Sequence, residues 1–487
     1  MGLRWTIAPH AKGRLPEELL KDPERFIREC GKVISAGKDH LTVLCEGLFV
    51  KVYRLKSAEG FKGLFRCTKA EREWKGSVRL HQAGVPVPLP LAWGKDGLFP
   101  GRGFYVAEAL RDANSMDKVG KEKLEALLPA AARAIKAMHD AGIFHRDLHG
   151  GNVILKGEKV FLTELHRHRL YPGGVPDDKR CWDVACFLHS LRGRLSSRRK
   201  QIFLREYFGP IVPLFLQKAE RRVFLRHLEH TRRDCVDDSL AFRRVSLREL
   251  KGWAIRRLSL QALETILDEH MRALRRGGEE LKKVGRRSSV TLFTYKGDRI
   301  CVKEYRFGPL SGLKERFRLP KPRRAWINAN LLFEMGIGEM KPLAYLERWG
   351  WGLNKAYLVV SSPENYLEMS HYLGKLKSSK ERRCFVEAFA SFLKTLQERG
   401  VWHRDLKAHH VMVAEKAEQW EFTLIEPEDL RFIKVKDRYV LRNLIQLNNT
   451  LPPFVDWRLK LRFLKNLLED RDVKTVFYKV NVRSKGN

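Results

Sequence analysis

The alternation of apolar and polar positions along the chain predicts two similar sets of strands, each followed by helices. Strand-like segments fall at 41–54, 106–110, 290–305 and 356–360. Apolar residues at helical spacing fall at 121–140, 181–235 and 381–399. Because strands precede helices in both parts of the chain, the pattern indicates an α+β fold that occurs twice.

A comparison of the two parts extends the match well beyond these strands. Three pairs of segments follow one another in the same order: 48–54 with 300–306, 73–85 with 325–337, and 161–165 with 423–427. The first pair has a lysine at its centre, Lys51 in one part and Lys303 in the other. An ordered series of this kind predicts two homologous domains, which we place at 1–245 and 246–487.

The tetrapeptide His-Arg-Asp-Leu occurs once in each domain. Followed by three residues and an Asn, it is the catalytic-loop pattern of protein-kinase-like enzymes. In that pattern the Asp accepts the proton of the attacking hydroxyl, and the Asn holds a magnesium ion. The first copy has Asn152 at the metal position. It therefore predicts phosphoryl transfer with Asp147 as the base, and with His145 and Arg146 orienting the loop.

Phosphoryl transfer asks the protein mainly for positioning and for neutralisation of charge. Lys51, at the centre of a predicted strand, is placed to direct a fixed positive charge at the phosphates of the donor. Glu73, on the helix that follows, is the candidate partner that holds Lys51, and Glu71 is the alternative. A small β-rich lobe above a larger helical lobe, with a cleft that excludes water, would serve this chemistry.

Glu164 departs from the catalytic pattern. It ends the strand after the catalytic loop, where an Asp that chelates the principal magnesium ion is expected. Glutamate keeps the carboxylate but reaches about 1.5 Å farther, and Mg²⁺ requires near-octahedral geometry. We therefore expect Glu164 and Asn152 to bind the metal, with lower activity or a preference shifted towards Mn²⁺. The second domain has Glu426 at the same place, which indicates a shared design.

The second domain keeps the signature but loses supporting residues. It retains Lys303, His403, Arg404, Asp405 and Glu426. Three supports are replaced: Ala325 stands for Glu73, His410 for Asn152, and Asn443 for Asp183, the predicted anchor of the first catalytic loop. Because an imidazole is a poor ligand for Mg²⁺, we predict a degenerate domain, a pseudokinase. A weak or differently metallated kinase is the alternative.

Composition adds an expectation about the partner. The 487 residues include 94 Lys and Arg against 58 Asp and Glu, a net charge of +36. A field of that size favours a nucleic acid, an anionic membrane surface or a phosphorylated glycolipid, without choosing among them. The chain has no apolar run of about eighteen residues, so no membrane-spanning helix is expected. Eight scattered cysteines without a Cys-x-x-Cys pair predict reduced thiols in the cytoplasm.

The motifs together resemble those of the bacterial lipopolysaccharide core kinases that phosphorylate heptose or Kdo, a family related to WaaP and InaA. Three stretches carry the resemblance: Glu73-Trp74 followed by Gly84–Pro88, His145–Leu155, and Glu164–Leu170. The last stretch is similar to the Asp-Leu/Phe-His-Arg run of the family, with Glu in place of Asp. The resemblance extends over both domains, although it is thin outside these motifs.

This resemblance implies two tandem protein-kinase-like domains and an enzyme that uses ATP and Mg²⁺. It implies that the acceptor is a sugar hydroxyl of the lipopolysaccharide inner core. The protein would then be cytoplasmic and bound peripherally to the inner membrane. The high positive charge agrees with this, because lipid A and the core sugars carry phosphates, and each basic residue near an anionic membrane contributes about 1 kcal/mol.

Two alternatives remain open at this point. A kinase of the RIO type, which acts near RNA or ribosomes, would also combine a basic chain with a kinase-like core. That family tends to have His-Gly-Asp in place of His-Arg-Asp, and a duplicated domain would be unusual in it. The other alternative is a non-catalytic scaffold whose two domains bind nucleotide or glycolipid without transfer.

Overall fold

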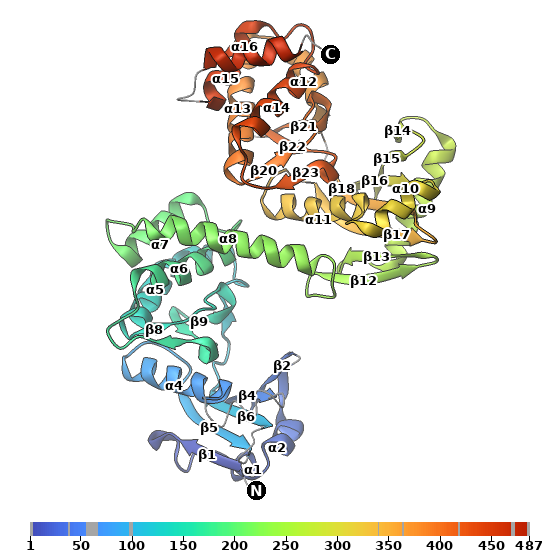
Figure 1. Ribbon diagram of the computed structural model, residues 1–487. Helices are drawn as coiled ribbons and strands as arrows, with labels where there is room; N and C mark the ends of the chain where they lie inside the picture. Colours follow the sequence, from blue (N-terminus) through green and yellow to red (C-terminus); the bar gives the residue numbers. More distant parts are fainter. Residues whose placement is uncertain are drawn as a thin grey trace. The chain divides into compact units, whose positions relative to one another are not determined.

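The computed structural model describes residues 3–37, 39–54, 67–96, 101–338, 340–362, 365–416, 419–468 and 473–484. The chain forms two compact units, Met1–Arg226 and His227–Asn487. Each unit contains a sheet-rich lobe and a helical lobe (Figure 1). The expected domain boundary at 245/246 falls inside β12 (Phe242–Leu247), which is a strand of the second unit's sheet.

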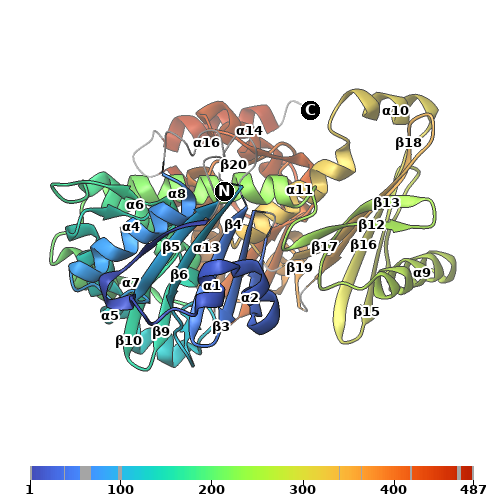
Figure 2. The same cartoon turned by 90° about the horizontal axis from the view of Figure 1, so that it is seen from below.

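The small lobe of the first unit contains a six-stranded antiparallel sheet of order β1-β5-β6-β4-β3-β2. Its strands are β1 (Leu3–Ile7), β2 (Lys32–Ala36), β3 (His40–Cys45), β4 (Leu48–Arg54), β5 (Pro90–Asp96) and β6 (Arg102–Glu108). Three helices accompany the sheet: α1 (Glu17–Lys21), α2 (Pro23–Cys30) and α4 (Lys69–Gln82). The short helices α1 and α2 lie beside the strands in Figure 2.

The alternation of side chains along β4 sends its residues to opposite faces of this sheet. Val50 and Val52 belong to the hydrophobic core that also contains residues of α1 and α2. Tyr53 packs instead in a cluster with Ala70 of α4. Lys51, two residues before Tyr53, therefore lies on the α4 face of a central strand, where its side chain is buried.

The large lobe of the first unit is mostly helical. Its helices are α5 (Lys121–Asp140), α6 (Asp177–Ser190), α7 (Ser197–Phe208) and α8 (Phe215–Asp234). Short strands carry the connecting loops: β7 (Asn114–Ser115), β8 (Ile143–Phe144), β9 (Val153–Lys156), β10 (Lys159–Leu162) and β11 (Arg169–Leu170). One continuous core of leucine, alanine, valine and phenylalanine side chains joins α5 to α8 and β9 to β10. This core fixes the loops on which the predicted catalytic residues lie.

The second unit repeats the sheet and adds one strand. Its seven-stranded antiparallel order is β12-β13-β17-β18-β16-β15-β14. The strands after β12 are β13 (Leu250–Ile255), β14 (Leu281–Val284), β15 (Ser288–Tyr295), β16 (Asp298–Arg306), β17 (Lys341–Trp349) and β18 (Leu353–Ser361). The helix α9 (Leu260–Arg276) lies beside this sheet (Figure 2). Its buried leucine and isoleucine side chains belong to the same core as side chains of the strands. Lys303 lies in β16, which corresponds to β4 of the first unit.

Two helices, α10 (Pro309–Lys314) and α11 (Lys321–Glu334), follow β16. The helical lobe of the second unit contains α12 (Met369–Lys375), α13 (Ser379–Glu398), α14 (Asp437–Asn448), α15 (Trp457–Leu468) and α16 (Val473–Ser484). Its short strands are β19 (Leu367–Glu368), β20 (Val401–His403), β21 (Val411–Lys416), β22 (Gln419–Leu424) and β23 (Leu430–Phe432). The predicted α+β fold with a small sheet-rich lobe and a larger helical lobe in each half is confirmed.

Across the described ranges, no helix combines the length and the apolar character that crossing a membrane requires. All eight cysteines are free thiols.

Candidate active site

Lys51 is the centre of a buried polar cluster in the first unit. Its Nζ lies 3.5 Å from Glu73 Oε2 and donates a hydrogen bond to Glu164. Thr68 caps the N-terminus of α4, and its hydroxyl accepts the backbone N–H of Glu71. One turn into this helix, Glu73 is buried and also accepts a hydrogen bond from the hydroxyl of Tyr53. The structure thus brings together the predicted pair Lys51 and Glu73.

Glu71, the alternative partner, lies elsewhere on α4. Its carboxylate is 2.8 Å from Lys75 Nζ, one turn further along the same helix. Lys75 is half exposed. Glu71 therefore belongs to a surface ion pair, and the partner of Lys51 is Glu73.

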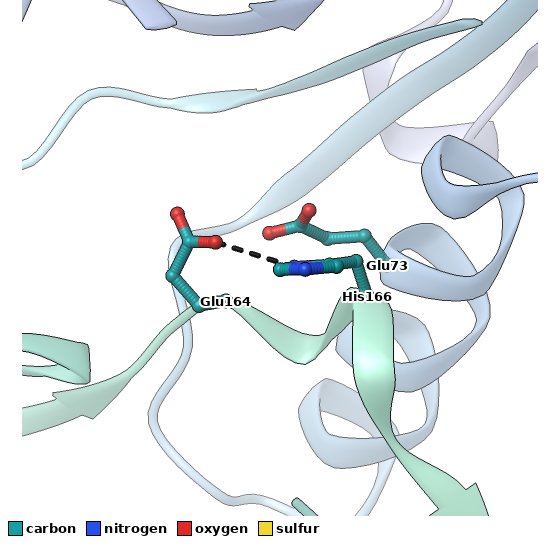
Figure 3. A group of neighbouring side chains, drawn as sticks. All are labelled: Glu73, Glu164 and His166. Atoms are coloured by element: carbon teal, nitrogen blue, oxygen red, sulfur yellow. Dashed lines mark ion pairs between the residues drawn. The ribbon is translucent and has the colours of Figure 1, made fainter. Parts of the chain in front are cut away.

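Glu164 and His166 complete the polar cluster (Figure 3). Glu164 has a left-handed backbone conformation, with φ of 65°, between β10 and the 3-10 helix η3 (Leu165–Arg167). His166 Nδ1 lies 3.3 Å from Glu164 Oε2. One ligand atom from each of Glu73, Glu164 and His166 lies within 4.8 Å of the other two. Lys51 already places a positive charge at the carboxylates of this group.

The surroundings shift the pKa values of the two carboxylates of the cluster in opposite directions. Burial raises the pKa of Glu73, and the charge of Glu164 adds to this, while Lys51 opposes it. Burial also acts to raise the pKa of Glu164, but the adjacent His166 ring and the charge of Lys51 outweigh it. They lower the pKa of Glu164 to about 2. Glu164 is therefore ionised at any physiological pH.

The catalytic-loop residues are held by Asp183, a fully buried carboxylate on α6. Asp183 Oδ2 accepts the backbone N–H of His145 at 2.7 Å, and Oδ1 accepts that of Arg146 at 3.0 Å. Arg146 has φ of 72°, a conformation that few non-glycine residues adopt. The two charge-assisted hydrogen bonds fix this turn, and Asp183 is the anchor that the sequence indicated.

Asp147 is half exposed at the tip of the loop. Its Oδ2 lies 3.1 Å from Arg167 Nη1, and its backbone N–H donates to His145 Nδ1 at 3.3 Å. His145 is buried, with Nε2 2.9 Å from the backbone oxygen of Thr163. Burial lowers the pKa of His145, so its neutral ring acts as a spacer between the loop and the strand that leads to Glu164.

Asn152 connects the loop to Glu164 and has a free amide oxygen. Its Nδ2 donates to the backbone oxygen of Asp147 at 2.9 Å. Thr163 donates its N–H and its hydroxyl to the backbone oxygen of Asn152 at 3.0 and 3.1 Å. Within the described chain nothing donates to Asn152 Oδ1. An amide oxygen and the adjacent Glu164 carboxylate are hard oxygen donors of the kind that Mg²⁺ and Mn²⁺ prefer, so these residues fit such an ion.

Sequence reasoning missed three residues of this site: Tyr53, His166 and Arg167. The alternation of β4 could have placed Tyr53 on the same face as Lys51, because the two residues are two positions apart in the strand. His166 and Arg167 lie in the stretch that carries the family resemblance. Their contacts with Glu164 and Asp147 depend on the turn of η3, for which the sequence has no strong local signal.

The second unit has the same cluster with one carboxylate relocated. Lys303 Nζ lies 2.8 Å from Glu428 Oε1 and 3.8 Å from Glu426 Oε1, and Tyr305 donates its hydroxyl to Glu428 at 3.2 Å. Glu428 follows Glu426 by two residues, as His166 follows Glu164. Burial alone would lower the pKa of Lys303, but Glu428 and Glu426 raise it. The interpretation that this lysine lost its support with Ala325 is therefore wrong.

The second catalytic loop is held by amides. Asn443 Nδ2 donates to the backbone oxygen of His403 at 2.7 Å, and Gln446 accepts the N–H of Leu406 at 3.1 Å. His410 occupies the place of Asn152, and its Nδ1 lies 2.6 Å from the backbone oxygen of Asp405. It keeps the structural hydrogen bond of Asn152. It offers no amide oxygen, so its side chain does not fit Mg²⁺ as Asn152 does.

Comparisons with known proteins agree with this geometry. The model of the family described as "Lipopolysaccharide kinase (Kdo/WaaP) family" matches residues 50–181 and 281–475, one match in each unit and more than half of the chain. A lipopolysaccharide core heptose(I) kinase WaaP from Pseudomonas aeruginosa is 30% identical over 187 residues, which cover 33% of this chain and 69% of that protein.

Two solved structures are also similar. A structure of WaaP in complex with acyl carrier protein has 25% identity and a TM-score of 0.35, and the match covers 45% of this chain and 98% of that chain. An aminoglycoside-3'-phosphotransferase of type VIII has 17% identity and a TM-score of 0.31, with 41% and 97% covered. The matches to the family model in both units, together with the lysine, aspartate and glutamate positions above, identify a kinase. The chain belongs to the lipopolysaccharide kinase (Kdo/WaaP) family.

Proposed function

We propose that the first unit transfers the terminal phosphoryl group of ATP to a hydroxyl of heptose or Kdo in the lipopolysaccharide inner core. One observation carries this proposal. Hydrogen bonds join the candidate base Asp147, through Asn152 and Thr163, to the strand end that bears Glu164. Glu164 in turn contacts Lys51. The name of the P. aeruginosa relative, a heptose(I) kinase, supports a sugar acceptor.

In this proposal each residue has a defined task. Lys51 binds the donor phosphates, and Glu73 and Tyr53 hold it in position. Asp147 accepts the proton of the sugar hydroxyl as its oxygen attacks the terminal phosphorus, and the bond to the bridging oxygen breaks to release ADP. Arg167, whose Nη1 lies 3.1 Å from Asp147 Oδ2, orients that carboxylate.

Mg²⁺ or Mn²⁺ would be held by Asn152 Oδ1 and the Glu164 carboxylate. Such an ion supplies charge neutralisation at the donor phosphates. The low pKa of Glu164 supports this role, because the carboxylate needs no deprotonation before it binds a cation.

We assign the second unit a non-catalytic role, because His410 replaces the amide oxygen of Asn152. Glu426 there is surrounded by cations: Lys283 at 3.6 Å, Lys303 at 3.8 Å and His410 at 3.5 Å. Burial acts to raise the pKa of Glu426, but Lys303 and His410 lower it. Glu164 of the first unit has similar neighbours, Lys51 and His166, so the two units differ mainly at the position of Asn152. The first unit of the structure would then be the catalytic domain, and the second unit would be the degenerate one.

We place the protein at the cytoplasmic face of the inner membrane, bound peripherally to the anionic glycolipid. The net charge of +36 supports such a surface as a partner. The alternative of a kinase that acts near RNA has no support from the family match.

Transfer of labelled phosphate from ATP to purified core lipopolysaccharide tests the proposal. The wild-type chain should label the core in the presence of Mg²⁺ or Mn²⁺, and Asp147→Asn should lower the rate by about a hundredfold to ten-thousandfold, as expected for loss of a general base. Equal labelling by wild type and Asp147→Asn would contradict the assignment. So would nucleotide binding without transfer to any core glycolipid.

A further inference from the structure

A cavity of about 470 Å³ lies in the first unit beside the catalytic loop. Its wall comes from the loop itself, from the turn after Glu164, and from helices α6 and α8. Six of its side chains are cationic: Arg146, Arg167, Lys179, Lys218, Arg222 and Arg226. The one acidic side chain of the wall, Asp178, lies 3.0 Å from Lys179 Nζ. The cavity therefore has a large excess of positive charge.

The sequence of α8 produces this wall by helical spacing. Leu216, Ala219 and Val223 form an apolar stripe that packs in the core of the large lobe. An adjacent cationic stripe is formed by residues four positions apart along the helix: Lys218, Arg222 and Arg226. Like charges at this spacing repel one another and weaken a helix. An anion in the cavity would remove this repulsion.

Two of these cations have no partner within the described residues. No ion pair or hydrogen bond involves the side chain of Lys218 or Arg222 there. Arg226 lies over the ring of Trp182, with its Cζ 5.9 Å from the ring centroid. Trp182 itself lines the cavity and provides a flat surface against which a sugar ring can pack.

The cavity adjoins the candidate base through Arg167. Arg167 belongs to its wall, and Arg167 Nη1 lies 3.1 Å from Asp147 Oδ2. Arg146 Nη1 donates to the backbone oxygen of Arg167 at 3.4 Å. A saccharide that presents a hydroxyl to Asp147 can therefore extend its neighbouring groups towards the cations of α8.

We propose that this cavity binds a phosphate or carboxylate group of the acceptor saccharide, close to the hydroxyl that receives the phosphoryl group. Guanidinium and ammonium groups bind such anions through charge-assisted hydrogen bonds, and arginine does so with two parallel bonds. The inference rests on the proposed function, and it names the chemistry that selects the acceptor: an anionic sugar is bound and a neutral one is not.

The test compares the double variant Lys218→Gln/Arg222→Gln with the control Arg221→Gln. Arg221 is exposed on the same helix and does not line the cavity. The acceptor is soluble core oligosaccharide freed from lipid A. The double variant should raise the acceptor KM about a hundredfold, roughly tenfold for each lost cation. Its kcat and its KM for ATP should stay within about twofold of wild type, and the control should match wild type throughout.

A second measurement is independent of catalysis. Calorimetric titration with free Kdo, a carboxylated sugar, should show binding to wild type and to Arg221→Gln and none to the double variant. If wild type transfers phosphate and the double variant keeps the wild-type acceptor KM, the cavity proposal is overturned while the proposed function stands. If wild type transfers nothing, the function fails, and the loss of Kdo binding alone still supports the cavity.

Phosphatidylglycerol vesicles separate the acceptor anion from lipid headgroups. We expect wild type and double variant to bind such vesicles equally. If the double variant loses vesicle binding and keeps the acceptor KM, the cationic stripe serves membrane docking, and the proposal is wrong. Circular dichroism of both variants should match wild type, because the altered side chains are exposed.

Discussion

Glu164 is ionised because of its neighbours, although it is partly buried. The adjacent His166 ring and the charge of Lys51 hold the pKa of its carboxyl at about 2 against the effect of burial. The same lysine is the partner of Glu73, so the two carboxylates share one cation. Donor phosphates that bind near Lys51 would add negative charge to the two carboxylates already there. A divalent ion at Glu164 would compensate for that added charge.

The low pKa of Glu164 leads to a prediction about acid stability. A carboxyl whose pKa is lower in the folded state than its ordinary 4.5 stabilises the fold above pH 4.5 and loses this contribution as pH falls towards 2. The difference in unfolding free energy between wild type and Glu164→Gln should therefore be constant above pH 4.5 and shrink below it. Urea denaturation, with hydrogen exchange of peptides from the first unit, measures this.

The control for that experiment is Glu158→Gln, at an exposed position of the same unit. It should leave the pH dependence of stability as it is in wild type. A difference for Glu164→Gln that does not change between pH 6 and pH 3 would contradict the ion-paired state of Glu164.

His270 gives a prediction for the second unit. It is fully buried, its Nδ1 lies 2.6 Å from Thr291 Oγ1, and burial lowers its pKa to about 4 although Glu304 opposes this. Its neutral form stabilises the fold above about pH 6.5, and this contribution of roughly 3 kcal/mol is lost as pH falls through 4. His270→Gln should remove that part of the acid sensitivity, measured by hydrogen exchange of α9 and β15.

The exposed His371 provides the matched control, since His371→Gln removes an imidazole that is surrounded by solvent. Equal acid sensitivity of wild type and His270→Gln between pH 6.5 and pH 4 would show that this ring is not the group that titrates.

At the scale of the elements, local patterns located the parts of the site that lie on regular structure. The alternation of β4 indicated a central lysine, and the helix after it offered Glu73, with Glu71 as the alternative, as the partner of that lysine. The contacts in the structure distinguish the two glutamates. The contacts that come from turns could not be predicted in this way. Glu428 reaches Lys303 only because the 3-10 helix η6 (Pro427–Asp429) packs against α11, so a comparison of aligned positions finds Ala325 and no carboxylate.

The relocation of this carboxylate can be tested by a double-mutant cycle. Glu428→Ala removes the nearest carboxylate from buried Lys303 and Tyr305 and should lower the unfolding free energy of the second unit by roughly 3–5 kcal/mol. Ala325→Glu alone should also destabilise, since it buries a second carboxylate. Together the two changes should cost less than their sum, because the new glutamate takes the place that Glu73 has in the first unit. Urea denaturation of the three variants measures the coupling.

Additive effects of Glu428→Ala and Ala325→Glu would contradict the idea that the two positions serve one lysine. Glu158→Ala, on the surface of the other unit, should leave the stability of the second unit unchanged.

At the scale of the whole molecule, the duplication was clear from the ordered motifs, whereas the boundary between the halves was not. Helix α8 runs through the division between Arg226 and His227 without a glycine or proline to mark it. β12 adds a seventh strand that has no counterpart in the first sheet. A boundary drawn from the repeat therefore falls inside this strand.

Part of the positive charge of the whole chain is concentrated at one place in the structure. A net charge of +36 indicates a polyanionic partner but no position for it. The cavity beside Asp147 gathers part of that charge at one place, where it can select an acceptor. The match of the family model to both units shows that one family design was used twice, and the side chains at the metal position separate the two copies.

Mass spectrometry of core lipopolysaccharide tests the central claim most directly. Cells that lack the protein would be complemented with wild type, Asp147→Asn or Asp405→Asn, expressed to equal levels, and the core phosphate would be counted. We predict that wild type and Asp405→Asn restore the phosphate and that Asp147→Asn does not. Restoration by Asp147→Asn with failure of Asp405→Asn would contradict the assignment of the active site to the first unit.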